Sequence, residues 1–211
     1  MRSVQWLRGV VSRMSAFVTC GATVPFPALV EAVLAPEFVG CLSQEGYRVL
    51  CVQFGRGYDF EAQFTSLTCT RMPLESAEVS ELRQLVRDER VTVMGYKVQD
   101  VVVLGFAYSN NILQIIDRYG DVVISHAGTG SILDSLRLNK KLIVVVNHTL
   151  MDNHQKQIAE KFQNLGHILA TNPTVIELCD AMKRLKHEDL IPLSSETNTE
   201  FMERLKSIAY S

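Results

Sequence analysis

The residues best suited to chemistry lie between Asp121 and Asp134, where a short apolar run leads through two glycines into an amphipathic segment. Gly128 and Gly130 lack side chains, so the backbone there can approach a phosphate closely. A helix beginning near Ser131 would offer unpaired N–H groups and the positive end of its dipole. Asp134, one turn further on, is spaced to accept hydrogen bonds from sugar hydroxyls. The spacing therefore predicts an anion-binding site beside a sugar.

A purely structural interpretation of these residues stays open. Ser131 with Asp134 also fits a capping box, in which each satisfies backbone amides at a helix start, and the glycines could simply turn the chain.

A second polar loop, 147–155, precedes another amphipathic segment. Asp152 and Gln155 again fit a capping pair. His148, Asp152 and His154 have the chemistry of metal ligands, but their spacing matches no known ligand template. We therefore expect no metal here, and we expect the amide and imidazole groups of this loop to face a sugar.

The elements that must position these loops follow from hydrophobic periodicity. The second half alternates strands at 121–125, 142–147 and 167–170 with helices at 131–138, 153–165 and 174–185. This alternation predicts an α/β, Rossmann-like fold with a largely parallel sheet and helices on both faces. In such sheets ligands bind beyond the carboxyl ends of the strands. One crevice should then collect the loops at Gly21, Phe106, His126 and Asn147.

The first half is less regular. Strands are expected at 16–20, 47–54, 91–96 and 100–106, with helices from the prolines after residue 24 to about 34 and at 109–119. Gly55-Arg56-Gly57 closes the second of these strands. Residues 58–90 are interpreted as a variable insertion with some helix. The whole predicts one domain at 15–191, preceded by a flexible extension at 1–14 and followed by a linker and last helix at 192–211.

Composition excludes several classes of protein. The net charge of -2 comes without a basic stripe, so nucleic acid is not expected as a partner. No apolar run reaches about 18 residues, so no membrane span is expected. Five cysteines without C-x-x-C spacing indicate reduced, buried thiols of a cytoplasmic protein, with Cys20 the one candidate for a catalytic thiol.

Three stretches together resemble a known family: 21–27 (GATVPFP), 125–140 (SHAGTGSILDSLRLNK) and 150–155 (LMDNHQ). They resemble the catalytic subunits of the fungal UDP-N-acetylglucosamine (UDP-GlcNAc) transferase of asparagine-linked glycosylation, over about residues 15–211. The resemblance implies addition of the second GlcNAc to dolichyl-diphosphate-GlcNAc on the cytosolic face of the endoplasmic reticulum. UDP-GlcNAc would be the donor; no cofactor is certain, and a requirement for a divalent metal stays open.

That family is similar to the donor-binding, C-terminal half of a bacterial GT-B glycosyltransferase that builds the peptidoglycan lipid precursor. GT-B enzymes have two Rossmann-like domains facing across a cleft. The resemblance implies that a membrane-anchored second subunit completes the cleft, binds the acceptor and recruits this chain to the membrane. A last helix with Phe201, Leu205 and Ile208 on one face is a candidate for docking that partner, although it could equally pack on this domain.

The resemblance also implies roles for individual residues. Asp134 would bind the ribose hydroxyls, 128–130 would lie along the diphosphate, and 106–107 would lie near the uracil. His154 and Gln155 would hold the donor sugar. The complete expected donor-binding set is Gly21, Ala22, Thr23, Phe106, Ala107, His126, Gly128, Thr129, Gly130, Ser131, Asp134, Asn153, His154 and Gln155. No catalytic residue is assigned.

Two departures from the family pattern stand out. His126 replaces an arginine of the bacterial enzymes, which leaves charge neutralisation to backbone dipoles or to the partner. Lys141 replaces a proline at the start of a strand.

A dehydrogenase is the main alternative function. Against it, Leu133 occupies the third glycine position of the dinucleotide-binding motif, and no acidic residue follows about 20 residues further on. A nucleotide-binding protein without catalysis also remains open.

Overall fold

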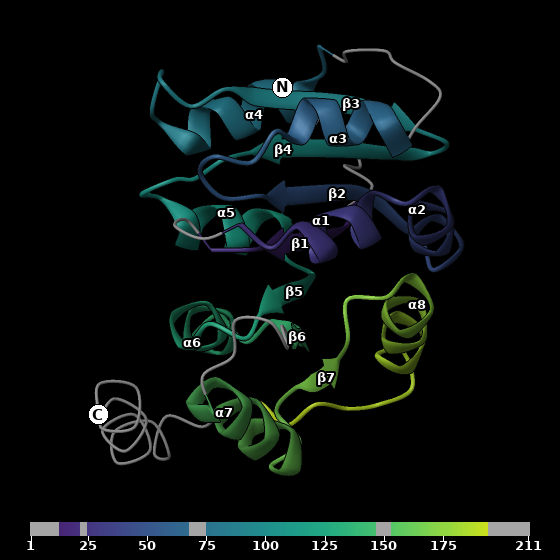
Figure 1. Cartoon of the computed structure of the whole chain (residues 1–211), viewed down its shortest axis with the longest axis vertical. Helices are drawn as coiled ribbons and strands as arrows, with labels where there is room; N and C mark the ends of the chain where they lie inside the picture. Colours follow the sequence, from purple (N-terminus) through teal and green to yellow (C-terminus); the bar gives the residue numbers. More distant parts are fainter. Residues whose placement is uncertain (1–12, 22–24, 68–74, 147–152, 194–211) are drawn as a thin grey trace, which may run out of the picture.

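A seven-stranded sheet forms the centre of the molecule (Figure 1). The computed structural model describes residues 13–21, 25–67, 75–146 and 153–193. The strand order is β3-β4-β2-β1-β5-β6-β7, which Figure 1 shows from top to bottom. The strands are β1 (Met14–Thr19), β2 (Tyr47–Gln53), β3 (Val93–Val98), β4 (Val101–Phe106), β5 (Val122–His126), β6 (Lys141–Val145) and β7 (Leu169–Thr171). All neighbours are parallel except β3 and β4, so the predicted α/β fold class is confirmed.

Helices cover both faces of this sheet. They are α1 (Pro27–Leu34), α2 (Pro36–Gln44), α3 (Phe60–Leu67), α4 (Ala77–Val86), α5 (Ile112–Tyr119), α6 (Thr129–Arg137), α7 (Asn153–Asn164) and α8 (Val175–Arg184). Successive strand residues point to opposite faces. Ala16 and Val18 join the core that packs against α1, α2, α3 and α8, whereas Phe17 joins the core against α4, α5, α6 and α7. The strands are therefore apolar throughout, as expected for a doubly covered sheet.

Two regions differ from what the sequence predicts. α2 was not expected. It begins at Pro36, directly after α1, and proline is tolerated there because an N–H group at the start of a helix has no acceptor within the helix. The stretch between residues 58 and 90 holds α3 and α4, and Phe64 and Leu82 there are fully buried. Both helices therefore belong to the core of the domain.

The last described residues are part of the domain. Leu193 is buried in the core beside α7, and the preceding backbone is held because Ile191 N–H donates to Gly166 O at 2.9 Å. The helix expected to carry Phe201, Leu205 and Ile208 lies outside the described residues, as does most of the expected extension at 1–14. Within the described ranges, no helix is both long and apolar enough to cross a membrane.

Candidate functional site

The candidate site lies where the carboxyl ends of β1 and β5 meet. From β1 the chain builds the sheet outward in one direction through β2 and β4, and from β5 it builds in the other through β6 and β7. The direction thus changes between β1 and β5, which is the place where open α/β sheets bind ligands. The loop at Gly21 follows β1, and the turn from His126 to Gly128 follows β5. These two expected segments are therefore neighbours.

The imidazole of His126 joins the two segments. Its Nδ1 donates to Thr19 O at 3.2 Å. A Cβ at Gly21 would lie 3.1 Å from the Cε1 and Nε2 atoms of this ring, and a Cβ at Gly128 would overlap Nε2. Gly21 also has a left-handed backbone, with φ of +80°. Packing against His126 therefore explains both glycines without any ligand.

His126 does not supply the positive charge of the arginine it replaces. Burial of the ring lowers its pKa, and the hydrogen bond to Thr19 O only partly opposes this effect. Since an ordinary histidine titrates near pH 6.5, the ring is neutral at pH 7. Attraction of an anion to this crevice must come from another group.

The start of α6 offers such attraction. The helix begins at Thr129, two residues earlier than expected, and its N-cap residue Gly128 makes no side-chain capping bond. The amides of the first turn therefore have no partner within the helix. The capping-box interpretation of Ser131 and Asp134 is wrong, because both residues lie inside the helix. A Cβ at Gly130 would meet none of the described residues within 4 Å, so this part of the structure leaves space above the turn.

Asp134 lies one turn into α6, with its side chain 29% exposed. Its Oδ1 is 3.8 Å from Nη1 of Arg137, which is too long for a hydrogen bond and does not fix the carboxylate. Burial raises the pKa of Asp134, and the Arg137 charge works against that rise. A partly desolvated carboxylate at this position is able to accept hydrogen bonds from hydroxyl groups.

The structure does not support the expected contact of Phe106 with uracil. The Phe106 ring is fully buried and packs on Phe17, with 6.4 Å between ring centroids. Its carbonyl accepts from Phe54 N–H at 3.1 Å, and the Ala107 carbonyl accepts from Gly55 N–H at 3.0 Å. Phe106 therefore offers a base neither its ring nor a free carbonyl. Ala107 is partly exposed, and its contact with uracil stays a prediction.

The remaining expected donor contacts are located only by their backbone or lie outside the described residues. α7 begins at Asn153, so His154 and Gln155 occupy its first turn. Because β6 runs parallel to β5, this helix also starts at the carboxyl edge of the sheet. Ala22 and Thr23 are not among the described residues, and neither are His148 and Asp152 of the weighed metal cluster. The described residues contain no group of three potential metal ligands.

Cys20 lies beside the crevice but is unsuited to nucleophilic catalysis. Its thiol is buried, and burial raises its pKa to about 12. A thiol with that pKa is not ionised near neutral pH, and only the thiolate is an effective nucleophile. Cys20, Cys41, Cys51 and Cys179 are all free thiols, as expected, whereas Cys69 lies outside the described residues.

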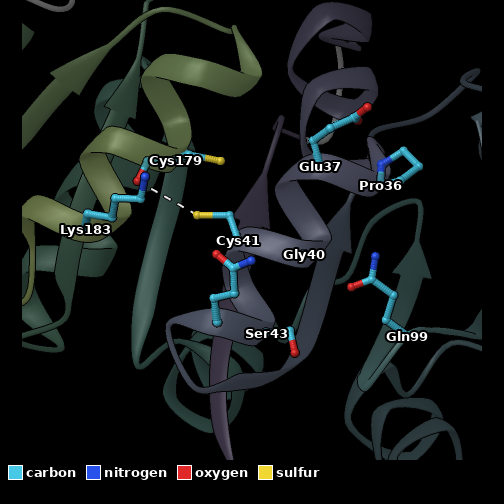
Figure 2. A pocket seen from close by; sticks show the side chains of 9 residues that line it. Pro36, Glu37, Gly40, Cys41, Ser43, Gln99, Cys179 and Lys183 are labelled. Carbon is cyan, nitrogen blue, oxygen red and sulfur yellow. Dashed lines mark hydrogen bonds between the residues drawn. The ribbon is translucent and has the colours of Figure 1, made fainter.

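A separate cavity of about 580 Å³ lies between α2 and α8 (Figure 2). The Cys41 thiol in it donates to Cys179 O at 3.9 Å. Gln99, from the turn before β4, also lines this cavity. It therefore lies at the amino end of β4, away from the crevice between β1 and β5.

The sequence prediction missed Arg56, which follows β2 at the same edge as the crevice. Its guanidinium carbon lies 3.9 Å from the centroid of the Tyr108 ring. The signal available in the sequence was an arginine between two glycines directly after a strand, which was interpreted only as the end of that strand.

Comparison with known proteins agrees with this architecture. The pattern of the glycosyltransferase family 28 C-terminal domain matches residues 15–209. The UDP-N-acetylglucosamine transferase subunit ALG13 of Candida glabrata is 98% identical over 198 residues, which cover 94% of this chain and 100% of the relative. Its Saccharomyces cerevisiae counterpart is 43% identical over 203 residues, covering 96% and 100%.

Solved structures give the same result. An NMR solution structure of ALG13 superposes with a TM-score of 0.72 at 43% identity, covering 96% of this chain and 100% of that one. The crystal structure of Acinetobacter baumannii MurG shares the fold, with a TM-score of 0.52 at 14% identity, and this chain matches 43% of its length. The chain belongs to the glycosyltransferase family 28 C-terminal domain family and, within it, to the ALG13 subunits of UDP-N-acetylglucosamine transferase.

Proposed function

We propose that this chain is the catalytic, UDP-GlcNAc-binding subunit of a heteromeric N-acetylglucosaminyltransferase. The complex adds the second GlcNAc to dolichyl-diphosphate-GlcNAc during lipid-linked oligosaccharide synthesis for N-glycosylation. The chain is cytoplasmic and acts at the cytosolic face of the endoplasmic reticulum. The names of its relatives support the donor and the subunit role, and the resemblance of its motifs supports the acceptor and location.

The observation that carries the donor assignment is the uncapped start of α6 beside open space over Gly130. In the transfer, a hydroxyl of the acceptor sugar attacks the anomeric carbon of the donor and uridine diphosphate leaves. Negative charge develops on the departing diphosphate. Amides of the first turn of α6, with the helix dipole behind them, are preorganised to stabilise that charge, and such groups often contribute most to rate enhancement.

We infer that a second subunit takes part, because the described domain corresponds to one of the two Rossmann-like domains that face each other across a GT-B cleft. Acceptor positioning and exclusion of water require the opposite wall, and positioning alone is worth about 7–11 kcal/mol of a reaction barrier. We infer that a membrane-anchored partner supplies this wall and binds the dolichol-linked acceptor. Phe201, Leu205 and Ile208 are our proposed docking stripe for that partner.

Replacement of Asp134 by alanine tests the donor site. We expect transfer of labelled GlcNAc by the assembled complex, and UDP binding by the isolated chain, each to fall by about ten-fold or more through loss of charge-assisted bonds to ribose. The melting temperature should stay close to that of the wild type, because Asp134 is partly exposed and caps no helix.

The matched control is Arg137→Ala, which removes the 3.8 Å ion pair from the same helix while keeping the carboxylate. This variant should bind UDP normally. Wild-type transfer by Asp134→Ala would refute the ribose assignment. Nucleotide binding by the wild-type complex without transfer would instead favour a non-catalytic nucleotide-binding subunit.

A further inference from the structure

Arg56 lies on a turn that projects from the carboxyl end of β2. The flanking glycines both have left-handed backbones, with φ of +86° at Gly55 and +78° at Gly57. Phe54, just before the turn, stacks on Phe60 at the start of α3 with a centroid separation of 4.7 Å. Both ends of the turn are therefore anchored in the core, while Arg56 itself is exposed.

The Arg56 guanidinium rests on a fixed aromatic platform. Its Cζ lies 3.9 Å from the centroid of the Tyr108 ring. The Tyr108 hydroxyl donates to Asp88 Oδ2 at 3.3 Å, and Arg90 Nε and Nη2 donate to the two carboxylate oxygens of Asp88, each at 3.0 Å. This pairing with Arg90 holds the pKa of Asp88 at about 2. The Asp88 charge is thus balanced by Arg90 and does not require Arg56.

A cation–π contact leaves N–H donors of a guanidinium available for hydrogen bonds. A guanidinium that lies on a ring uses its face, and its N–H donors point outward in the plane, where they match phosphate oxygens two at a time. Within the described part of the chain, no acidic side chain lies within ion-pair distance of Arg56. The platform therefore restricts the cation without neutralising it.

The turn is continuous with the candidate donor site. A Cβ at Gly55 would lie 3.2 Å from Gly21 O, and Gly21 in turn packs on the His126 ring. His126 is neutral at pH 7, and Arg137 already lies near Asp134. Neither His126 nor Arg137 thus supplies an unpaired cation to a diphosphate on the β5 side of the crevice, whereas Arg56, on the β2 side, pairs with no acidic side chain among the described residues.

We propose that Arg56 is a phosphate-binding residue of the transferase, preorganised by Tyr108 to pair with a substrate diphosphate at the carboxyl edge of the sheet. This inference rests on the proposed function. Two substrates of that reaction carry a diphosphate, the nucleotide sugar and the dolichol-linked acceptor, and both present the same chemistry to a guanidinium.

The test compares Arg56→Gln, Arg56→Lys, Tyr108→Leu and Tyr108→Phe in the assembled transferase. We expect Arg56→Gln to raise KM for one of the two diphosphate substrates by about ten-fold, the scale of a lost charge-assisted bond. Lysine at position 56 should recover part of the loss. Tyr108→Leu removes the aromatic ring and should raise the same KM, by less than Arg56→Gln does. Tyr108→Phe keeps the ring and should have the KM of the wild type.

Binding to the isolated chain separates the two sources of diphosphate. If Arg56 serves the donor, Arg56→Gln weakens binding of UDP and of inorganic pyrophosphate by calorimetry. If it serves the acceptor, UDP binding is unchanged and only the acceptor KM rises. Arg83→Gln is the control, since Arg83 is an exposed arginine of α4 paired with Glu75 at 3.6 Å.

The outcome that overturns the inference is an Arg56→Gln enzyme with both KM values, kcat and pyrophosphate binding within two-fold of the Arg83→Gln control. Failure of the proposed function has a different signature, because the wild-type complex would then neither bind UDP nor transfer sugar. Since Arg56 is exposed, an unchanged circular dichroism spectrum is expected for every Arg56 variant.

Discussion

The glycines around His126 have two different roles. Gly21 and Gly128 face the imidazole, and a side chain at either position would collide with it. A Cβ at Gly130, two residues further on, would meet none of the described residues within 4 Å. The same short motif thus combines one glycine required by packing inside the protein with another whose missing side chain leaves room for a ligand.

Alanine substitutions should distinguish these two glycines. Gly128→Ala overlaps the His126 ring and should lower the free energy of unfolding by about 1–3 kcal/mol, the usual cost of overpacking. Gly130→Ala should leave the free energy of unfolding unchanged or slightly raised, because alanine favours helix. Its methyl group should nevertheless weaken UDP binding. Chemical denaturation and calorimetry measure the two quantities, and normal UDP binding by Gly130→Ala would contradict our placement of the diphosphate.

The lowered pKa of His126 predicts how stability depends on pH. The unfolded histidine takes up a proton near pH 6.5, whereas the folded one resists protonation until its lower pKa is reached. The contribution of His126 to the free energy of unfolding is therefore constant above about pH 6.5. It falls as the pH drops from about 6.5 towards the lower pKa of the folded protein, by at most about 1.4 kcal/mol per pH unit for one proton. Denaturation between pH 7.5 and 5.5 should show this decline in the wild type.

His126→Asn should show a shallower decline over the same pH range, even if it is less stable overall. Equal slopes in the wild type and in His126→Asn would mean that the fold does not hold His126 neutral.

At the scale of whole elements, the sequence predicted the parallel sheet because its signals are local. Apolar strand runs alternate with helical stripes throughout the second half, and each of those six elements is present. α2 was missed because Pro36 looks like the end of a helix, although proline at the first position can also begin one. The start of α6 was misplaced because Ser131 with Asp134 imitates a capping box, while the true N-cap, Gly128, carries no side-chain signal.

The parts of the site that resisted prediction depend on contacts between distant segments. The sequence does not show which face of the sheet Phe106 occupies. Every residue of β4 is buried, so this strand has no alternation of polar and apolar residues. The contact of His126 with Gly21 requires β1 beside β5, and that of Arg56 with Tyr108 requires β2 beside β4. Such pairings are set by topology, which local periodicity does not encode.

The first turn of α7 provides an element-scale prediction. Gln155 lies there, at the carboxyl edge of the sheet, and the family resemblance assigns it to the donor sugar. Gln155→Ala should relax discrimination between UDP-GlcNAc and its epimer UDP-N-acetylgalactosamine in the assembled enzyme, because a polar contact to one hydroxyl orientation is lost. The ratio of kcat/KM for the two donors measures this. An intact enzyme that rejects the epimer as strongly as before would exclude the contact.

At the scale of the whole molecule, the described residues form one domain around a single sheet. Its buried residues form one core on each face of the sheet, and Leu193 still belongs to one of them. The domain therefore extends at least to Leu193, and the proposed docking segment follows that residue.

Truncation after Leu193 tests the proposed docking helix and keeps every core residue that the structure describes. We expect loss of association with the proposed membrane-anchored partner in a pull-down, together with loss of transfer, while the circular dichroism spectrum and melting temperature are kept. Replacing Phe201, Leu205 and Ile208 together with serine should have the same effect in the full chain. Full association of the truncated chain would refute docking, and robust transfer by the purified single chain would refute the need for a partner.

The central position of β1 has a consequence for biosynthesis. β1 is made first, and one of its edges is soon filled by β2, but the other waits for β5, which begins past the middle of the chain. Ser15 and Asp121 close this seam, with Ser15 N–H donating to Asp121 Oδ2 at 2.7 Å. Until then the nascent chain exposes an apolar strand with an open edge, a surface that readily pairs with other chains. The crevice lies on the same seam, so a growing polypeptide is prone to aggregate for as long as the proposed nucleotide site is incomplete.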